Sequence, residues 1–204
     1  MTRMKSGMPE RVDFDGEKRA LRKKMLVVRR ALSPTDRRTF SEIIGERLVS
    51  HENVDKAQFV FAYVGMEDEV QTETLLSRLL DMGKQVAIPW ITGKRAMEAV
   101  LVPSMDALEA GTYHILTVRE EIREVLPPQA IDCVIVPGVA FGRDGTRLGM
   151  GGGYYDAFLP KAAKAVKIAA AFQCQIADHI PSLPHDCGVD WIATEQGVFK
   201  TSKK

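Results

Sequence analysis

The chain has 204 residues, and its apolar share of 45% is enough to build one substantial hydrophobic core in a single domain. Its 28 basic and 27 acidic residues give a net charge of +1, which argues against a protein that coats nucleic acid or an anionic membrane. Cys133, Cys174 and Cys187 lack the number and spacing of a disulfide framework or a zinc module, and no stretch approaches the roughly 18 apolar residues of a membrane-spanning helix. We therefore expect a cytoplasmic protein without nucleic-acid or membrane partners.

The N-terminal region predicts a loose tail followed by two helices. Residues 1–16 mix glycine, proline and charged residues without periodicity. From Glu17 onward, apolar residues at helical spacing predict an amphipathic and strongly basic helix. Ser33 and Pro34 then provide the N-cap and the first-turn proline of a second helix. The apolar positions of the first helix are Leu21, Met25, Val28 and Leu32.

The next part of the chain alternates strands and a helix in the order of a parallel sheet. Residues 57–64 (AQFVFAYV) are an apolar run of strand length, a helix is expected over residues 72–81, and residues 85–89 predict the following strand. Strands that are apolar on both faces are typical of a parallel sheet covered by helices on both sides, so we predict an α/β fold with a doubly wound sheet. The topology of residues 95–126 is left open. Further strands are expected over residues 97–102, 132–137, 167–172 and 191–194, and a further helix over 154–163.

The stretch 147–156 (RLGMGGGYYD) is the strongest chemical signal in the sequence. Its glycines lie between a predicted strand and a predicted helix, where glycine permits positive φ and lets backbone N–H groups approach a ligand closely. Phosphate is the ligand that such a nest binds best, and Arg143 and Arg147 add positive charge beside it. Asp156 is placed to hold a magnesium ion that bridges phosphate oxygens. The glycines are Gly149, Gly151, Gly152 and Gly153.

The spacing of these glycines departs from the two common nucleotide-binding templates. Tyr154 stands where the GxGxxG pattern has its third glycine, and GxxxxGK[ST] does not occur in the chain. Residues 143–146 (RDGT) predict a hairpin turn, since Asp-Gly favours type I′. The alternative interpretation of the remaining glycines is a flexible surface loop. Ordering glycines costs roughly 0.5–1 kcal/mol each relative to alanine, which favours a functional loop.

These residues resemble the 5-formyltetrahydrofolate cyclo-ligases, also called methenyltetrahydrofolate synthetases. Residues 147–156 resemble the signature block of that family, and the resemblance extends over residues 17–199. It implies a single-domain, Rossmann-like three-layer α/β sandwich with a mostly parallel sheet, preceded by the two helices and flanked by loose ends at 1–16 and 200–204. The other matching stretches are Lys18-Arg19-Ala20-Leu21-Arg22, Glu69-Val70-Gln71-Thr72, and Pro184-His185-Asp186 with Val189-Asp190-Trp191 and Thr194-Glu195.

The resemblance implies sites for ATP, for a folate and for Mg²⁺. Asp156 and Asp190 would bind Mg²⁺, and Arg147 and Tyr154 would act in catalysis. Glu69 would accept hydrogen bonds from the folate ring, and it follows a predicted strand, where open α/β sheets bind ligands. The residues expected to contact ATP are Lys18, Arg19, Ala20, Leu21, Arg22, Arg147, Leu148, Gly149, Met150, Gly151, Gly152, Gly153, Tyr154 and Tyr155. Those expected to contact the folate are Arg22, Val64, Glu69, Met150, Gly151, Gly152, Gly153 and Tyr154.

The reaction that the resemblance implies is the irreversible, ATP- and Mg²⁺-dependent conversion of 5-formyltetrahydrofolate to 5,10-methenyltetrahydrofolate, with release of ADP and phosphate. Phosphorylation of the formyl oxygen turns a poor leaving group into phosphate, and N10 then closes the ring. The protein would position the substrates and neutralise charge, as a monomer or a weak homodimer.

Two other functions remain open from the sequence. One is a phosphate-binding sugar isomerase or CoA-transferase-like enzyme, which can share such a sheet and phosphate loop. The other is a non-catalytic nucleotide- or RNA-binding protein that works through the basic helix. On that helix, the resemblance favours a functional role only for Lys18 and Arg22. The remaining basic residues Lys23, Lys24, Arg29 and Arg30 are expected to be solvated, and His179, His185, Asp186 and Cys187 are expected to serve loop packing and capping rather than zinc binding.

Overall fold

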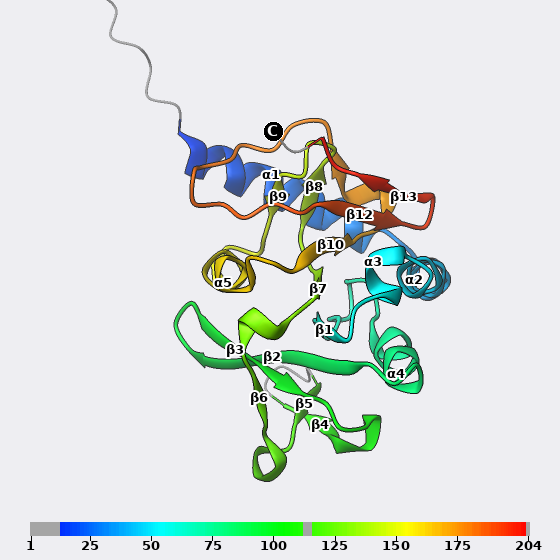
Figure 1. The fold of residues 1–204 in the computed structure, drawn as a ribbon. Helices are drawn as coiled ribbons and strands as arrows, with labels where there is room; N and C mark the ends of the chain where they lie inside the picture. Colours follow the sequence, from blue (N-terminus) through cyan, green and yellow to red (C-terminus); the bar gives the residue numbers. More distant parts are fainter. Residues whose placement is uncertain (1–12, 112–115, 203–204) are drawn as a thin grey trace, which may run out of the picture.

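The computed structural model describes residues 13–111 and 116–202 (Figure 1). The loose tail expected over residues 1–16 lies mainly outside them. The helices are α1 (Phe14–Arg30), α2 (Pro34–Val49), α3 (Glu52–Asp55), α4 (Glu73–Asp81) and α5 (Tyr154–Phe158). The strands are β1 (Phe59–Ala62), β2 (Gln85–Gly93), β3 (Ala96–Leu101), β4 (Leu108–Ala110), β5 (Leu116–Val118), β6 (Val125–Leu126), β7 (Cys133–Val136), β8 (Ala140–Gly142), β9 (Arg147–Leu148), β10 (Val166–Ala170), β11 (Ile176–Ala177), β12 (Trp191–Thr194) and β13 (Gly197–Lys200).

The main sheet has eight strands in the order β13-β12-β10-β7-β1-β2-β3-β6. The central strands β12, β10, β7, β1 and β2 are parallel, whereas β13, β3 and β6 pair antiparallel at the two sides. β7 is buried along its whole length, as expected of a strand that is covered on both faces. The prediction of an α/β fold with a mostly parallel sheet is confirmed.

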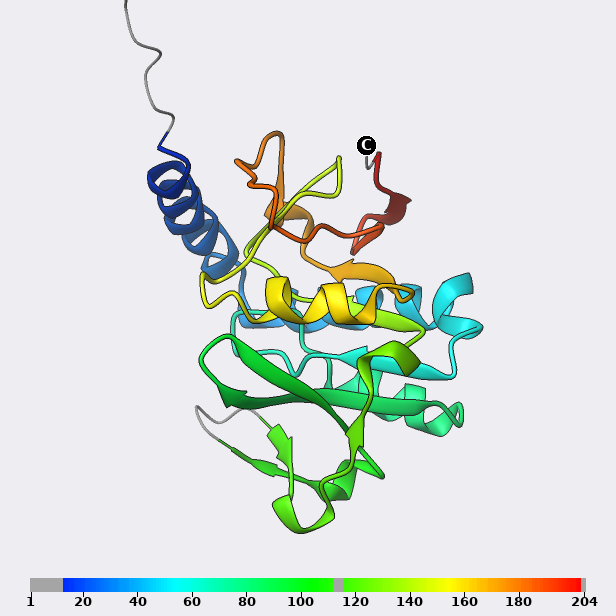
Figure 2. The same ribbon diagram turned by 60° about the vertical axis from the view of Figure 1, so that its left-hand side comes forward.

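Helices cover both faces of this sheet, so the fold is a three-layer sandwich (Figures 1 and 2). α2, α3 and α4 lie on one face, where Leu48 and Leu76 belong to the same buried cluster as Val60 of β1. On the other face, α5 and the 3-10 turn that follows it contribute Phe158 and Leu159 to a second buried cluster. Residues 95–126, whose topology the sequence left open, add β3, β6 and the separate hairpin β4–β5.

α1 lies outside the two helical layers, beside the small sheet β11-β8-β9 (Figure 2). Its Met25 packs with Leu148 and Ile180 in a third, smaller apolar cluster. The helix begins at Phe14, earlier than the expected start at Glu17, because the Asp13 carboxylate accepts a hydrogen bond from Gly16 N at 2.9 Å and caps the first turn. α1 therefore packs against the part of the chain that carries the glycine-rich loop.

Two further expected elements differ in length from those in the structure. β2 was expected to end at Pro89 but continues to Gly93. β1 pairs with β2 only up to Ala87, so at Pro89 the strand pairs with β3 alone. Because that position has a partner on one side only, the strand tolerates a proline, which has no N–H to donate. The helix expected over 154–163 is α-helical only to Phe158 and continues as a 3-10 turn over Leu159–Ala162, because Pro160 cannot donate an α-helical hydrogen bond.

At the C-terminus, β13 was missed by the sequence analysis. It pairs antiparallel with β12 after a turn in which Thr194 Oγ1 accepts hydrogen bonds from Gln196 N and Gly197 N at 3.2 and 3.3 Å. Thr201 beyond it is buried, and its hydroxyl donates to Val189 O at 2.9 Å. The folded part of the chain thus extends past residue 199, where the domain was expected to end.

The predicted hairpin turn at residues 143–146 joins β8 to β9, but it is not of type I′. Gly145 has φ 91°, whereas the neighbouring Asp144 has negative φ, and Gly145 N donates to Gly142 O at 2.9 Å. A type I turn followed by one left-handed glycine accounts for this geometry. Within residues 13–111 and 116–202, the helices are all too short or too polar to cross a membrane.

Candidate active site

The order of the strands reverses direction at β1, in the middle of the sheet. From β1 the chain passes to β2 on one side, whereas β7 pairs with β1 on the other side. Ligands of open α/β sheets bind beyond the carboxyl ends of the strands at such a reversal. Here these ends lead into the loop that contains Asp68 and Glu69, after β1, and into Gly138, after β7.

Arg29 of α1 lies beside the carboxyl ends of β1 and β7. Its side chain is 1% exposed, Nη2 lies 2.9 Å from Asp68 Oδ1, and Nη1 lies 3.5 Å from both Glu69 Oε1 and Gly138 O. The expectation that Arg29 is solvated is therefore wrong, because the helix face that carries it is buried against the loops. Arg30 is 65% exposed and reaches Asp68 from the outside, with its Nε 3.0 Å from Oδ2. Lys23 and Lys24 are exposed, as expected.

The two acids beside Arg29 have opposite pKa shifts. Burial raises the pKa of Glu69, although the hydrogen bond from Met66 N and the charge of Arg29 oppose it. Burial also disfavours ionisation of Asp68, but hydrogen bonds and charge from Arg29 and Arg30 outweigh it and lower the pKa of Asp68. Of the two acids, Glu69 is thus the one that takes up a proton more readily as the pH falls.

The loop that carries Glu69 is fixed by its own hydrogen bonds. Glu69 Oε2 accepts from Met66 N at 3.1 Å, and Gln71 Nε2 donates to Met66 O and Glu69 O at 2.7 and 2.9 Å. Thr72 Oγ1 donates to Tyr63 O at 2.7 Å and so ties the loop back to the end of β1. Val64, expected to contact the folate, is buried in the same loop. The Glu69 carboxylate is therefore held in place before any ligand binds.

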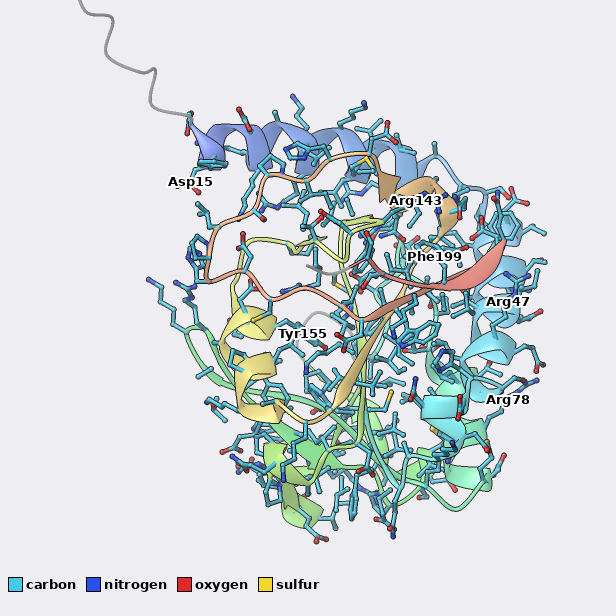
Figure 3. The ribbon with its side chains drawn as sticks, turned by 45° about the horizontal axis from the view of Figure 1, so that its top comes forward. Asp15, Arg47, Arg78, Arg143, Tyr155 and Phe199 are labelled. Carbon is cyan, nitrogen blue, oxygen red and sulfur yellow. The ribbon has the colours of Figure 1, made fainter. Side chains whose placement is uncertain are left out.

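Tyr155 projects from α5 into the interior beside this loop (Figure 3). Its ring stacks on Phe61 of β1, with centroids 6.2 Å apart, and its buried hydroxyl has no hydrogen-bond partner among the described residues. Burial, with the nearby charge of Glu69, raises the pKa of Tyr155. Its ring is partly buried between α5 and the sheet, and the expected contact with ATP stays a prediction.

The glycine-rich loop is ordered by left-handed backbone at two positions. Gly151 has φ 100° and Gly153 has φ 71°, conformations that residues with a side chain rarely adopt. Arg22 of α1 donates from Nε to Gly149 O at 2.8 Å, and its Cζ lies 3.7 Å from where a Cβ of Gly151 would stand. The structure thus brings together Arg22 and the loop that the sequence analysis assigned to the same site. Met150, in the middle of the loop, is 50% exposed.

Arg147 precedes this loop and is almost fully buried. Its Nη2 lies 2.5 Å from Asp156 Oδ1, its Nε donates to Cys187 O at 3.2 Å, and its guanidinium lies 5.7 Å from the centre of the Tyr155 ring. Asp156 Oδ1 also accepts from Cys187 N at 3.1 Å. Arg147 and Asp156 therefore join the start of α5 to the segment around Cys187. The expected catalytic Tyr154 adjoins the loop, since a Cβ at Gly152 would lie 2.8 Å from its ring.

Lys18, near the start of α1, forms an ion pair with Asp186. Asp186 Oδ2 also accepts a hydrogen bond from Leu183 N at 2.6 Å, which bears out the capping role expected for this residue. Burial would raise the pKa of Asp186, but the hydrogen bonds from Lys18 and Leu183 lower it overall. Lys18 thus lies on the same side of α1 as Arg22, whereas Arg19 and Ala20 are exposed, and Leu21 packs on the small apolar cluster below.

Asp156 and Asp190 have different surroundings. Asp156 offers a hard carboxylate oxygen beside the glycine loop, which suits Mg²⁺ held together with phosphate oxygens. Asp190 Oδ2 accepts a hydrogen bond from Lys167 N at 2.9 Å, beside the start of β10. Among the residues that the structure describes, no group of three or more acids, histidines or cysteines gathers as a metal site. A shared Mg²⁺ between these two acids stays a prediction.

Arg29 and Asp68 were missed as members of the site. Arg29 follows Lys18 and Arg22 at helical spacing, so the three basic residues share one face of α1. That spacing is visible in the sequence, and it would have separated Arg29 from the exposed Lys23 and Lys24.

The family model described as the 5-formyltetrahydrofolate cyclo-ligase family matches residues 15–195. The mouse protein named 5-formyltetrahydrofolate cyclo-ligase is 30% identical over 195 residues, covering 90% of this chain and 96% of the mouse chain. The Escherichia coli K12 protein of the same name is 28% identical over 176 residues, covering 84% of this chain and 97% of its own.

Solved structures agree with this match. The Aquifex aeolicus 5,10-methenyltetrahydrofolate synthetase superimposes with a TM-score of 0.80 at 33% identity, covering 92% of this chain and 93% of that one. A Mycoplasma pneumoniae 5,10-methenyltetrahydrofolate synthetase has the same fold, with a TM-score of 0.69 at 24% identity over 88% of this chain and 99% of its own. The chain belongs to the 5-formyltetrahydrofolate cyclo-ligase family.

Proposed function

We propose that the protein converts 5-formyltetrahydrofolate to 5,10-methenyltetrahydrofolate, with ATP consumed and ADP and phosphate released. The observation that carries this proposal is the ordered glycine loop, with left-handed Gly151 and Gly153, flanked by the guanidinium groups of Arg22 and Arg147. Backbone amides and arginines together suit a polyphosphate. The names of the mouse and Escherichia coli relatives support the same activity.

In this proposal the ATP phosphates bind along residues 147–155, with Lys18 and Arg22 reaching them from α1. The folate binds beside Val64 and the Glu69 carboxylate, which accepts hydrogen bonds from N–H groups of the pterin ring. Glu69 suits this role because Met66 N and Gln71 hold its loop rigidly, so little order is lost when the folate binds.

The chemistry then has two steps. The formyl oxygen attacks the γ-phosphorus of ATP, and the bond from that phosphorus to the ADP oxygen breaks. N10 next attacks the formyl carbon, loses its proton, and expels phosphate as the ring closes. Arg147 neutralises charge on the moving phosphoryl group. Tyr154, at the end of the glycine loop, orients the formyl group of the folate. Asp156, with Asp190 as the second expected ligand, would hold Mg²⁺, which supplies further neutralisation of phosphate charge when it is bound.

The test is to mix the purified protein with ATP, Mg²⁺ and 5-formyltetrahydrofolate and to follow the absorbance of the methenyl product. We expect product to form only when ATP and Mg²⁺ are both present, with one ADP released for each methenyl group. If ATP causes no product to form, the proposal is wrong.

A further inference from the structure

Arg95 occupies the turn between β2 and β3, and its backbone is unusual. Its φ of 57° is the only positive value at a residue other than glycine in the described part of the chain. A side chain in this left-handed region clashes with its own backbone, so the conformation persists only where the surroundings hold it. The adjoining Lys94 has no such constraint.

The Arg95 guanidinium lies directly on the glycine loop. If Gly153 carried a Cβ, that atom would lie only 2.6 Å from Arg95 Nε and 3.0 Å from Nη2. The missing side chain at Gly153 therefore makes the space that the guanidinium occupies. Figures 1 and 2 both show the β2–β3 turn reaching the start of α5, although the two segments are far apart in the sequence.

Arg95 thus completes a set of three arginines that approach one short loop from three different elements. Arg147 of β9 approaches Gly149, with Nη1 2.9 Å from the place of its Cβ, and Arg22 of α1 approaches Gly151. One nitrogen of Arg147 already pairs with Asp156, and Nε of Arg22 already donates to a backbone oxygen. Within residues 13–111 and 116–202, the Arg95 side chain has no ion-pair or hydrogen-bond partner. Its five donors are therefore available to a ligand at the end of the loop.

We propose that Arg95 is a further catalytic residue, which binds the phosphoryl group of ATP that is transferred to the formyl oxygen. The proposal rests on the function proposed above. Because the guanidinium is planar and permanently charged, it can bridge two oxygens of a phosphoryl group. It gives and takes no proton: the bond from phosphorus to the ADP oxygen breaks as the bond to the formyl oxygen forms, and Arg95 neutralises charge on the oxygens that do not react.

The variant Arg95→Gly tests this role without straining the backbone, because glycine adopts positive φ freely. We expect a fall in kcat on the order of 100-fold, as for removal of other charge-stabilising donors, with thermal stability unchanged or raised. Lys94→Ala, in the same turn, is the matched control and should keep kcat within about twofold of the wild type. Arg95→Asn, whose residue also tolerates this conformation, should lose activity in the same way.

Nucleotide binding separates this role from a merely structural one. A non-hydrolysable ATP analogue carries the γ-phosphoryl group, whereas ADP does not. Isothermal titration calorimetry should therefore show that Arg95→Gly raises the Kd of the analogue by roughly tenfold or more, as expected when one charge-assisted contact is lost. The Kd of ADP should be almost unchanged. Equal weakening of both ligands would overturn the assignment to the transferred group.

The outcomes also separate this inference from the proposed function. If the wild type forms no methenyl product, the proposed function fails. If the wild type is active and both Arg95 variants keep kcat within about twofold of it, the proposed function stands and the role of Arg95 is refuted.

Discussion

Near the end of α1, the Arg29 side chain places a positive charge beside the carboxyl ends of β1 and β7, where the order of the strands reverses. A guanidinium at 1% exposure is stable there because the Asp68 carboxylate pairs with its Nη2 at 2.9 Å. The pKa values of Asp68 and Glu69, the two acids beside it, are shifted in opposite directions. Arg29 lowers the pKa of Asp68 but does not offset the burial that raises the pKa of Glu69.

Removal of the Arg29 charge should therefore destabilise the fold. Arg29→Met keeps most of the volume but leaves Asp68 and Glu69 without their buried partner, and we expect a loss of about 3 kcal/mol in the free energy of unfolding. Arg30→Met removes the neighbouring, exposed arginine that also reaches Asp68, and should cost about 1 kcal/mol or less. Urea denaturation of both variants measures the difference. Equal costs would mean that the buried pair contributes no more than the surface pair.

Glu69 should separate folate binding from stability. The pKa of Glu69 is raised in the folded state, so its protonated form stabilises the fold. This contribution to the free energy of unfolding is fully present below the unfolded-state pKa, and it is lost as the pH rises through the folded-state pKa. Glu69→Gln resembles the neutral form, so its melting temperature at neutral pH should equal or exceed that of the wild type. Because the ionised carboxylate accepts the pterin hydrogens, wild-type affinity for 5-formyltetrahydrofolate should increase as the pH rises through the same pKa.

The variant should lose that pH dependence and bind the folate about 10-fold to 100-fold more weakly at neutral pH, as expected for a hydrogen bond to a charged group. Glu67→Gln, an exposed acid of the same loop, is the control and should retain both the affinity and the pH dependence. An unchanged pH profile in Glu69→Gln would exclude the carboxylate as a folate ligand.

At the scale of elements, α1 contacts the rest of the fold mainly through charged side chains and does not belong to either helical layer of the sandwich. Its buried face presents Lys18, Arg22 and Arg29 to three separate loops, beside one small apolar cluster that also contains Met25, Leu21 and Leu26. The sequence predicted the helix and its amphipathic character, but placed Val28 on the buried face, where it is 38% exposed. Hydrophobic spacing cannot identify a helix face whose partners are carboxylates and backbone oxygens.

The position of Lys18 on this face predicts a specific effect on ATP. Lys18→Met should raise KM for ATP by about tenfold, the equivalent of roughly 1.4 kcal/mol for one phosphate contact, with little change in kcat. Lys24→Met, on the exposed side of the same helix, should behave as the wild type. Steady-state kinetics with varied ATP at saturating folate makes the comparison. A similar KM for ATP in the two variants would show that Lys18 does not contact ATP.

At the scale of the whole molecule, the parallel core was predictable because each of its strands is a continuous apolar run. β1 and β7 lie within the expected stretches 57–64 and 132–137, and β10 begins one residue before the expected stretch 167–172. β13 was missed because Gly197–Lys200 is only half-buried and its alternation is too short to stand out. The glycine loop was predictable from composition, whereas the approach of Arg95 was not, since it depends on how a distant hairpin packs beside α5.

The ion pair between Lys18 and Asp186 joins residues separated by 168 positions along the chain. During synthesis, α1 leaves the ribosome before the strands of the sheet, whereas the segment that carries Asp186 follows only after most of them. Contacts of such long range form late, because the entropy of closing the intervening chain must be overcome first. A truncated or half-folded chain would thus have a basic helix but no nucleotide pocket. The ability to bind ATP should appear only in molecules that have finished folding.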